Sequence, residues 1–99
     1  MSDSIVHLEE GRPVDPKRFL SGAWREIGVR RIPPGDVERL VADRIEYAVY
    51  VIGGEGHAEN GGGRTEVAAG TAITILRGDE VAFASGPDPL KLFVVALEA

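Results

Sequence analysis

The chain of 99 residues is long enough for one domain with one hydrophobic core. Its 16 acidic and 11 basic residues give a formal net charge of −5, which argues against nucleic acid as a partner because nucleic-acid-binding proteins concentrate basic residues on one face. The absence of cysteine excludes disulfides, zinc–thiolate sites and a thiol nucleophile.

The start of the chain has neither a basic segment nor an apolar run, so it does not resemble a secretion signal. No stretch approaches the roughly 18 apolar residues that a membrane span requires. We therefore expect a cytoplasmic protein without a membrane partner.

Frequent glycine and proline residues divide the apolar residues into short runs, which is the pattern of an all-β sandwich or barrel. One short helix is predicted near the start. Asp15 can cap it, Pro16 suits its first turn, and Gly22 can end it after Phe19 and Leu20.

The first strand is predicted over residues 24–32, and the turn 33–36 ends it. A second strand region runs from about residue 37 to residue 52 and includes 45–52, which is rich in β-branched and aromatic residues. The glycine-rich turn 53–56 follows.

The second half of the chain is predicted to form a hairpin and three more strands. Residues 57–60 and 64–68 flank a glycine turn whose residues tolerate positive φ. Further strands are predicted over 71–76, 81–85 and 90–97. The total is seven or so strands in a single domain, residues 1–99, without repeats or linkers.

Two glycine frameworks stand out in this pattern. The first, at about 35–54, starts at Gly35, and five residues separate that glycine from Val41. One residue separates Val41 from Asp43, three separate Asp43 from Tyr47, and six separate Tyr47 from Gly54.

The second framework, at about 70–85, runs from Gly70 through five residues to Leu76, and then to Gly78, Val81 and Ser85. The two spacings resemble the motifs of the cupin family, G-x5-H-x-H-x3-E-x6-G and G-x5-P-x-G-x2-H-x3-N. All four glycines match, whereas the four metal-ligand positions do not.

The resemblance implies a cupin-like double-stranded β-helix, a jelly-roll barrel with at most one short N-terminal helix. The alternative is another β-sandwich in which the glycines mark ordinary hairpin turns. In the family, two histidines, a glutamate and a third histidine hold a divalent metal. Those positions carry Val41, Asp43, Tyr47 and Val81 here, and only Asp43 is a usual ligand type, so we expect no metal and no cofactor.

His57 and Glu59 share a strand face, because strand side chains alternate. They are a geometrically possible metal pair. Two protein ligands rarely hold a metal, so the interpretation as a pair at the rim is favoured.

Strand alternation also predicts which side chains occupy the former metal cavity. If the ligand positions still point inward, the pocket face consists of Val41, Asp43, Ile45, Tyr47, Val49 and Val51, joined by Val81, Phe83 and Ser85. An apolar lining with a few polar groups is typical of a small-molecule site. Asp43 is the candidate general acid or base, and Tyr47 is the candidate donor to a carbonyl or oxyanion.

A structural interpretation of the same two residues stands beside this one. Asp43 can lie at the barrel rim, paired with Arg39, Arg44 or Arg30, and Tyr47 can fill the volume left by the metal.

Two classes of function follow. The first is a metal-independent isomerase, cyclase, lyase or dehydratase that acts on a small organic molecule. The second is a non-catalytic ligand-binding or structural module. An electropositive pocket and a bell-shaped pH profile favour the first class, and a barrel filled by its own side chains favours the second.

A homodimer is expected in either class. Ala48, Tyr50 and Ile52 form an apolar face opposite the predicted pocket, and residues 90–97 are apolar on nearly both faces.

Overall fold

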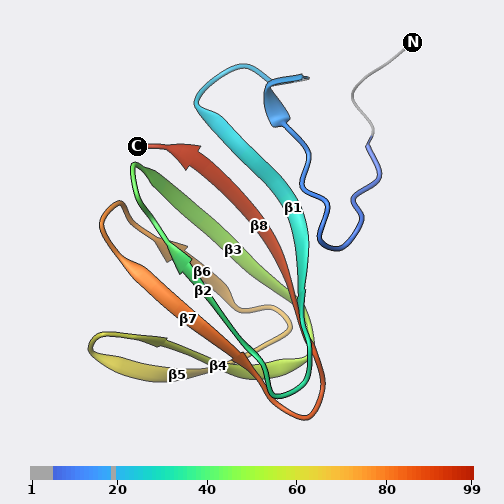
Figure 1. The fold of residues 1–99 in the computed structure, drawn as a ribbon, viewed down its shortest axis with the longest axis vertical. Helices are drawn as coiled ribbons and strands as arrows, with labels where there is room; N and C mark the ends of the chain where they lie inside the picture. Colours follow the sequence, from blue (N-terminus) through green and yellow to red (C-terminus); the bar gives the residue numbers. More distant parts are fainter. Residues whose placement is uncertain (1–5, 19) are drawn as a thin grey trace.

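The computed structural model describes residues 6–18 and 20–99, and its strands form two four-stranded antiparallel sheets (Figure 1). One sheet has the order β1-β8-β3-β6, and the other has the order β2-β7-β4-β5. The strands are β1 (Trp24–Ile32), β2 (Val37–Val41), β3 (Ile45–Gly53), β4 (Glu55–Asn60), β5 (Gly63–Ala68), β6 (Ala72–Ile75), β7 (Glu80–Ser85) and β8 (Leu90–Glu98). The expected all-β jelly roll is confirmed.

The core lies between the inner faces of the two sheets. Strand β8 alternates strictly, with Leu90, Leu92, Val94 and Ala96 buried, because each successive side chain points to the opposite face. Phe83 of β7 meets them from the other sheet and is 0% exposed. This two-layer packing gives the small chain its single core.

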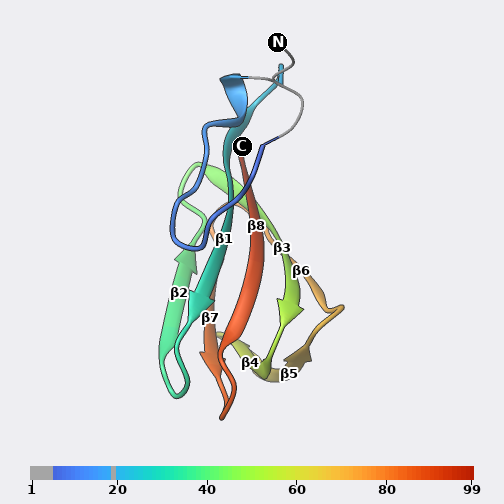
Figure 2. The ribbon, with the colours of Figure 1, turned by 90° about the vertical axis from the view of Figure 1, so that its right-hand side faces the viewer.

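The segment before β1 lies along the free edge of that strand. The amides of Gly11 and Val14 donate to the carbonyls of Val29 and Ile27, each at 2.8 Å. Figure 2 shows this segment at one end of the molecule, with the β4–β5 hairpin at the other. Pairing of this kind covers an edge strand that would otherwise expose unpaired backbone groups.

The expected N-terminal helix is reduced to a single 3-10 turn, Pro16–Arg18. Asp15 caps it as predicted, since its carboxylate accepts a hydrogen bond from the Lys17 amide at 3.0 Å. Phe19 lies outside the described residues. No helix in the described part of the chain is long and apolar enough to cross a membrane.

The second strand region is interrupted, contrary to expectation. Strand β2 ends at Val41, β3 begins at Ile45, and Arg44 between them adopts a left-handed φ of 62°. Ala42 holds this turn closed, because its amide donates to the Asp79 carbonyl at 2.9 Å and its carbonyl accepts from the Gly78 amide at 2.8 Å. The turn breaks the simple alternation from residue 41 to residue 51, so faces assigned by counting shift by one position within β2.

Two glycines, Gly54 of the first framework and Gly56 of the turn after it, are required by close backbone approach. Gly54 has a φ of 79°, and a Cβ there would overlap the Pro89 carbonyl oxygen. A Cβ at Gly56 would overlap the Ala84 carbonyl oxygen. These glycines let β4 leave β3 and cross tightly against the segments on either side of the β7–β8 connection.

Candidate functional site

The barrel interior was expected to hold the site, but its first-motif positions differ from those predicted. Leu40 and Ala42 are buried at 2% and 1% exposure, whereas Val41 is 52% exposed and Asp43 is also exposed. The prediction that Val41 and Asp43 face inward is therefore wrong. The left-handed turn at Arg44 breaks the alternation of side chains between β2 and β3. Val41 and Asp43 therefore do not lie on the same side as the inward residues of β3.

The inward side chains at these positions do not fit a metal of the type that the family holds. Leu40, Ala42 and Val81 have no donor atoms, which leaves the Tyr47 phenol alone. Over residues 6–18 and 20–99 no group of three histidine, cysteine, aspartate or glutamate side chains can hold a metal ion. The inward side chains at these positions therefore do not provide a ligand set for metal-centred chemistry.

The other predicted pocket residues face inward and fill the space. Val49, Val51, Val81 and Phe83 are at most 7% exposed and belong to one core cluster, against which Tyr47 packs. The Ser85 hydroxyl donates to the Pro33 carbonyl and so is not directed at a ligand. Ile45 is half-buried at the start of β3.

The structure does not bring the predicted catalytic pair together. Asp43 lies exposed in the β2–β3 turn, whereas Tyr47 is directed toward the core. The suggested rim pairs with Arg30 and Arg39 do not form either, because those arginines bind other carboxylates. The chemistry proposed for Asp43 and Tyr47 stays a prediction without a shared cavity.

A charged cluster closes the seam between the two sheets. Arg30 on the inner side of β1 contacts Glu26 at 3.0 Å and Glu38 of β2 at 3.1 Å, which joins the edge strands of opposite sheets. Burial alone would lower the pKa of Arg30, but hydrogen bonds and attraction from both glutamates outweigh it and raise that pKa above its ordinary value. The guanidinium is thus bound by two carboxylates, and its role is to hold the seam.

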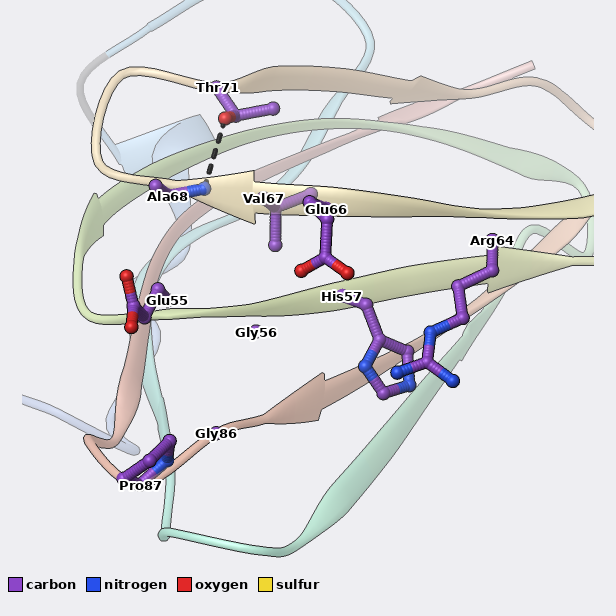
Figure 3. Close-up of a pocket in the computed structure, with 10 residues that line it drawn as sticks. All are labelled: Glu55, Gly56, His57, Arg64, Glu66, Val67, Ala68, Thr71, Gly86 and Pro87. Atoms are coloured by element: carbon purple, nitrogen blue, oxygen red, sulfur yellow. Dashed lines mark hydrogen bonds between the residues drawn. The ribbon is translucent and has the colours of Figure 1, made fainter.

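A polar hollow lies at the β4–β5 hairpin, in the sheet that also contains β2 and β7. It has a volume of about 470 Å³ and is lined by Glu55, Gly56, His57, Arg64, Glu66, Val67, Ala68, Thr71, Gly86 and Pro87. We call this hollow the hairpin groove. Figure 3 shows His57 and Arg64 at one end, Glu55 and Pro87 at the other, and the Glu66 carboxylate between them.

The hairpin register explains why these side chains meet. His57 lies directly opposite Glu66, and Arg64 is two pairs closer to the turn on the same face, opposite Glu59. Directly paired and diagonal neighbours on one face of a hairpin are close enough to act on one ligand. The groove therefore presents an imidazole, a guanidinium and two carboxylates around a floor of small residues.

The sequence singled out His57 in this groove but missed Arg64 and Glu66. The signal was present, because the predicted glycine turn fixes the pairing of 57–60 with 63–66. What the sequence did not provide was the position of Gly86 and Pro87, which follow β7 and reach the groove from a distant part of the chain.

The comparisons with known proteins bear on the fold. No protein-family model matches the chain, and no curated protein matches it. A cupin protein from Bacteroides fragilis has a similar structure, with a TM-score of 0.77 and 18% identity over 100% of this chain and 87% of that one.

Two further solved structures agree. A predicted oxalate decarboxylase from Thermotoga maritima has a TM-score of 0.71 at 19% identity, covering 78% of this chain and 69% of that one. Ectoine synthase from P. lautus has a TM-score of 0.68 at 18% identity over 77% of this chain, which spans only 54% of that enzyme. The chain therefore has the cupin fold, and the resemblance seen in its glycine frameworks is confirmed at that level.

Proposed function

We propose that this chain is a small, metal-independent binding module that takes its ligand at the hairpin groove and not inside the barrel. The observation that carries the proposal is the filled interior. Val51, Phe83, Leu92 and Val94 are each 0% exposed between the sheets, where an interior site would lie. An interior filled in this way favours the binding or structural class over a metal-independent enzyme.

The hairpin groove has the properties that a binding site requires. Its volume of about 470 Å³ falls in the range of roughly 300–1,000 Å³ found for small-molecule sites. It combines small apolar residues with a few polar groups, which would fix the orientation of a ligand. The activities named for the two enzyme-like neighbours are not assigned to this chain, because a structural likeness at 18–19% identity shows the fold alone.

Backbone amide shifts of labelled protein test the location of the site. Titration with a mixture of small polar metabolites is expected to shift the amides of residues 55–57 and 64–68, because these line the groove. Amides next to the core residues Val49 and Phe83 should stay within error. Shifts centred on those core residues instead would contradict the proposal and restore an interior site.

We further propose that the module is a homodimer formed through the outer face of the β1-β8-β3-β6 sheet. Two apolar rows cross all four strands there. One row contains Ile27, Val95, Ala48 and Thr74, and the other contains Val29, Phe93, Tyr50 and Ala72. A second copy is the occupant that the charges favour. Arg31 lies beyond one end of the rows and Glu46 beyond the other, so a two-fold axis that exchanges the two ends would bring these opposite charges together.

Substitution at the centre of this face is expected to break the dimer. Tyr50→Lys places a charge in the middle of an apolar row, at a side chain that is 46% exposed in the single chain. Multi-angle light scattering should give twice the chain mass of 10.6 kDa for the parent and the single mass for the variant. Val37→Lys is the matched control, because Val37 is 63% exposed but lies on the other sheet. A parent mass of one chain at micromolar concentration would refute the dimer.

A further inference from the structure

The four ionisable side chains of the hairpin groove have no ion-pair partner in the described part of the chain. The ion pairs there join Arg12 with Glu9, Lys17 with Glu98, Arg30 with Glu26 and Glu38, Arg39 with Glu80, and Lys91 with Glu10. Glu55, His57, Arg64 and Glu66 take part in none of these pairs. The groove thus concentrates charges of both signs whose hydrogen-bonding capacity is available to a ligand.

The arrangement of these charges suits a molecule that carries both signs close together. Arg64 and Glu66 leave the same face of β5 two residues apart, which is about 7 Å along a strand. A guanidinium binds a carboxylate through paired N–H donors, and carboxylates accept hydrogen bonds from an ammonium group. His57, opposite Glu66, can add a ring donor to the ligand carboxylate, and Glu55 can add a second acceptor for the ammonium.

The floor of the groove limits the rest of the ligand. Gly56 cannot carry a side chain, because a Cβ there would overlap the Ala84 carbonyl oxygen. Ala68 and Pro87, both exposed, present small apolar surfaces beside it. Such a floor favours a short apolar side chain on the ligand, because burying its methyl groups against these surfaces is favourable.

We propose that the hairpin groove binds a free α-amino acid with a small apolar side chain. Arg64 and His57 bind its carboxylate, and Glu66 and Glu55 bind its ammonium group. This inference rests on the proposed function, since it names the ligand class of the same groove.

The test uses three probes that differ by one charged group. L-valine carries both charges, 3-methylbutanoate lacks the ammonium group, and 2-methylpropylamine lacks the carboxylate. Each is titrated into the labelled full-length protein, and dissociation constants are taken from the amide shifts of residues 55–57 and 64–68. L-valine is expected to bind about tenfold or more tightly than either single-charge probe, since each lacks one charge-assisted contact.

Two variants and two matched controls assign the contacts. Arg64→Gln and Glu66→Gln are each expected to weaken L-valine binding about tenfold or more, while the folded-state spectrum is kept because both side chains are exposed. Arg39→Gln and Glu80→Gln remove an exposed ion pair on the same sheet, outside the groove, and should leave binding within about twofold.

The outcomes separate the two proposals. If 3-methylbutanoate binds the groove as tightly as L-valine and Glu66→Gln has no effect, the amino-acid ligand is wrong while the groove stays a binding site. If L-valine gives no shifts at tens of millimolar, the amino-acid ligand is likewise refuted. If L-valine shifts only amides next to core residues such as Val49 and Phe83, both the ligand class and the proposed site are overturned.

Discussion

The substitution Gly54→Ala is expected to destabilise the protein by more than about 3 kcal/mol, which is a large part of the total stability of a domain of this size. Two effects add. The φ of 79° costs an alanine about 1–2 kcal/mol, and the new methyl group would overlap the Pro89 carbonyl oxygen, so backbone on both sides must move. Urea unfolding followed by circular dichroism measures the loss.

The neighbouring glycine is the matched control. At Gly53 a Cβ would meet only the Lys91 side chain at ordinary contact distance, 3.8 Å, and no left-handed φ is required. Gly53→Ala is therefore expected to change stability by less than about 1 kcal/mol. Equal losses for the two variants would show that Gly54 is not the tight crossing point between β3 and β8.

The second large effect tests which residues of β2 face inward. Leu40→Ala is expected to cost about 2–5 kcal/mol, since Leu40 is 2% exposed within the core cluster. Val41→Ala, one position along, should change stability by less than about 0.5 kcal/mol, because Val41 is 52% exposed. Thermal and urea unfolding of the pair measure both. A larger loss for Val41→Ala would reinstate the inward assignment made by counting.

Much of the fold could be predicted because local signals agree with it. The strand 24–32 is bounded by Pro33 and matches β1, and the apolar run from Leu90 matches β8. The glycine frameworks predicted the cupin-like barrel, and one of their glycines, Gly54, lies where backbones approach too closely for a side chain. The path of the backbone requires glycine at such a position, so the spacing of glycines in the sequence indicates where it lies.

The site could be predicted only in part, because a single residue in a turn shifts the inward face. Arg44 adopts a left-handed conformation that nothing in its own residue type demands. Counting through it placed Asp43 inside when it lies outside, whereas Val49, Val51 and Phe83, on uninterrupted strands, face inward as counted. The predicted hairpin turn is enough to pair Glu66 with His57. That the pair lines a groove could not be predicted, because Gly86 and Pro87 reach it from a distant part of the chain.

The filled interior has a consequence for the way this barrel is used. When Leu40, Ala42 and Val81 occupy inward positions next to Tyr47, the space between the sheets contributes stability, since buried apolar groups add roughly 25 cal/mol per Å². Under the proposed function, polar recognition takes place on the outer surface. The hairpin groove, with unpaired charges of both signs, is the place that meets this requirement.

Elemental analysis of protein purified without chelator tests the central claim, that the interior holds side chains where a metal would lie. We expect less than one tenth of an equivalent of zinc, iron, nickel or manganese per chain, as an order-of-magnitude bound, because only the Tyr47 phenol offers a donor there. A content near one equivalent, unchanged in the His57→Ala variant and lost on chelation together with a fall in Tm, would contradict the claim.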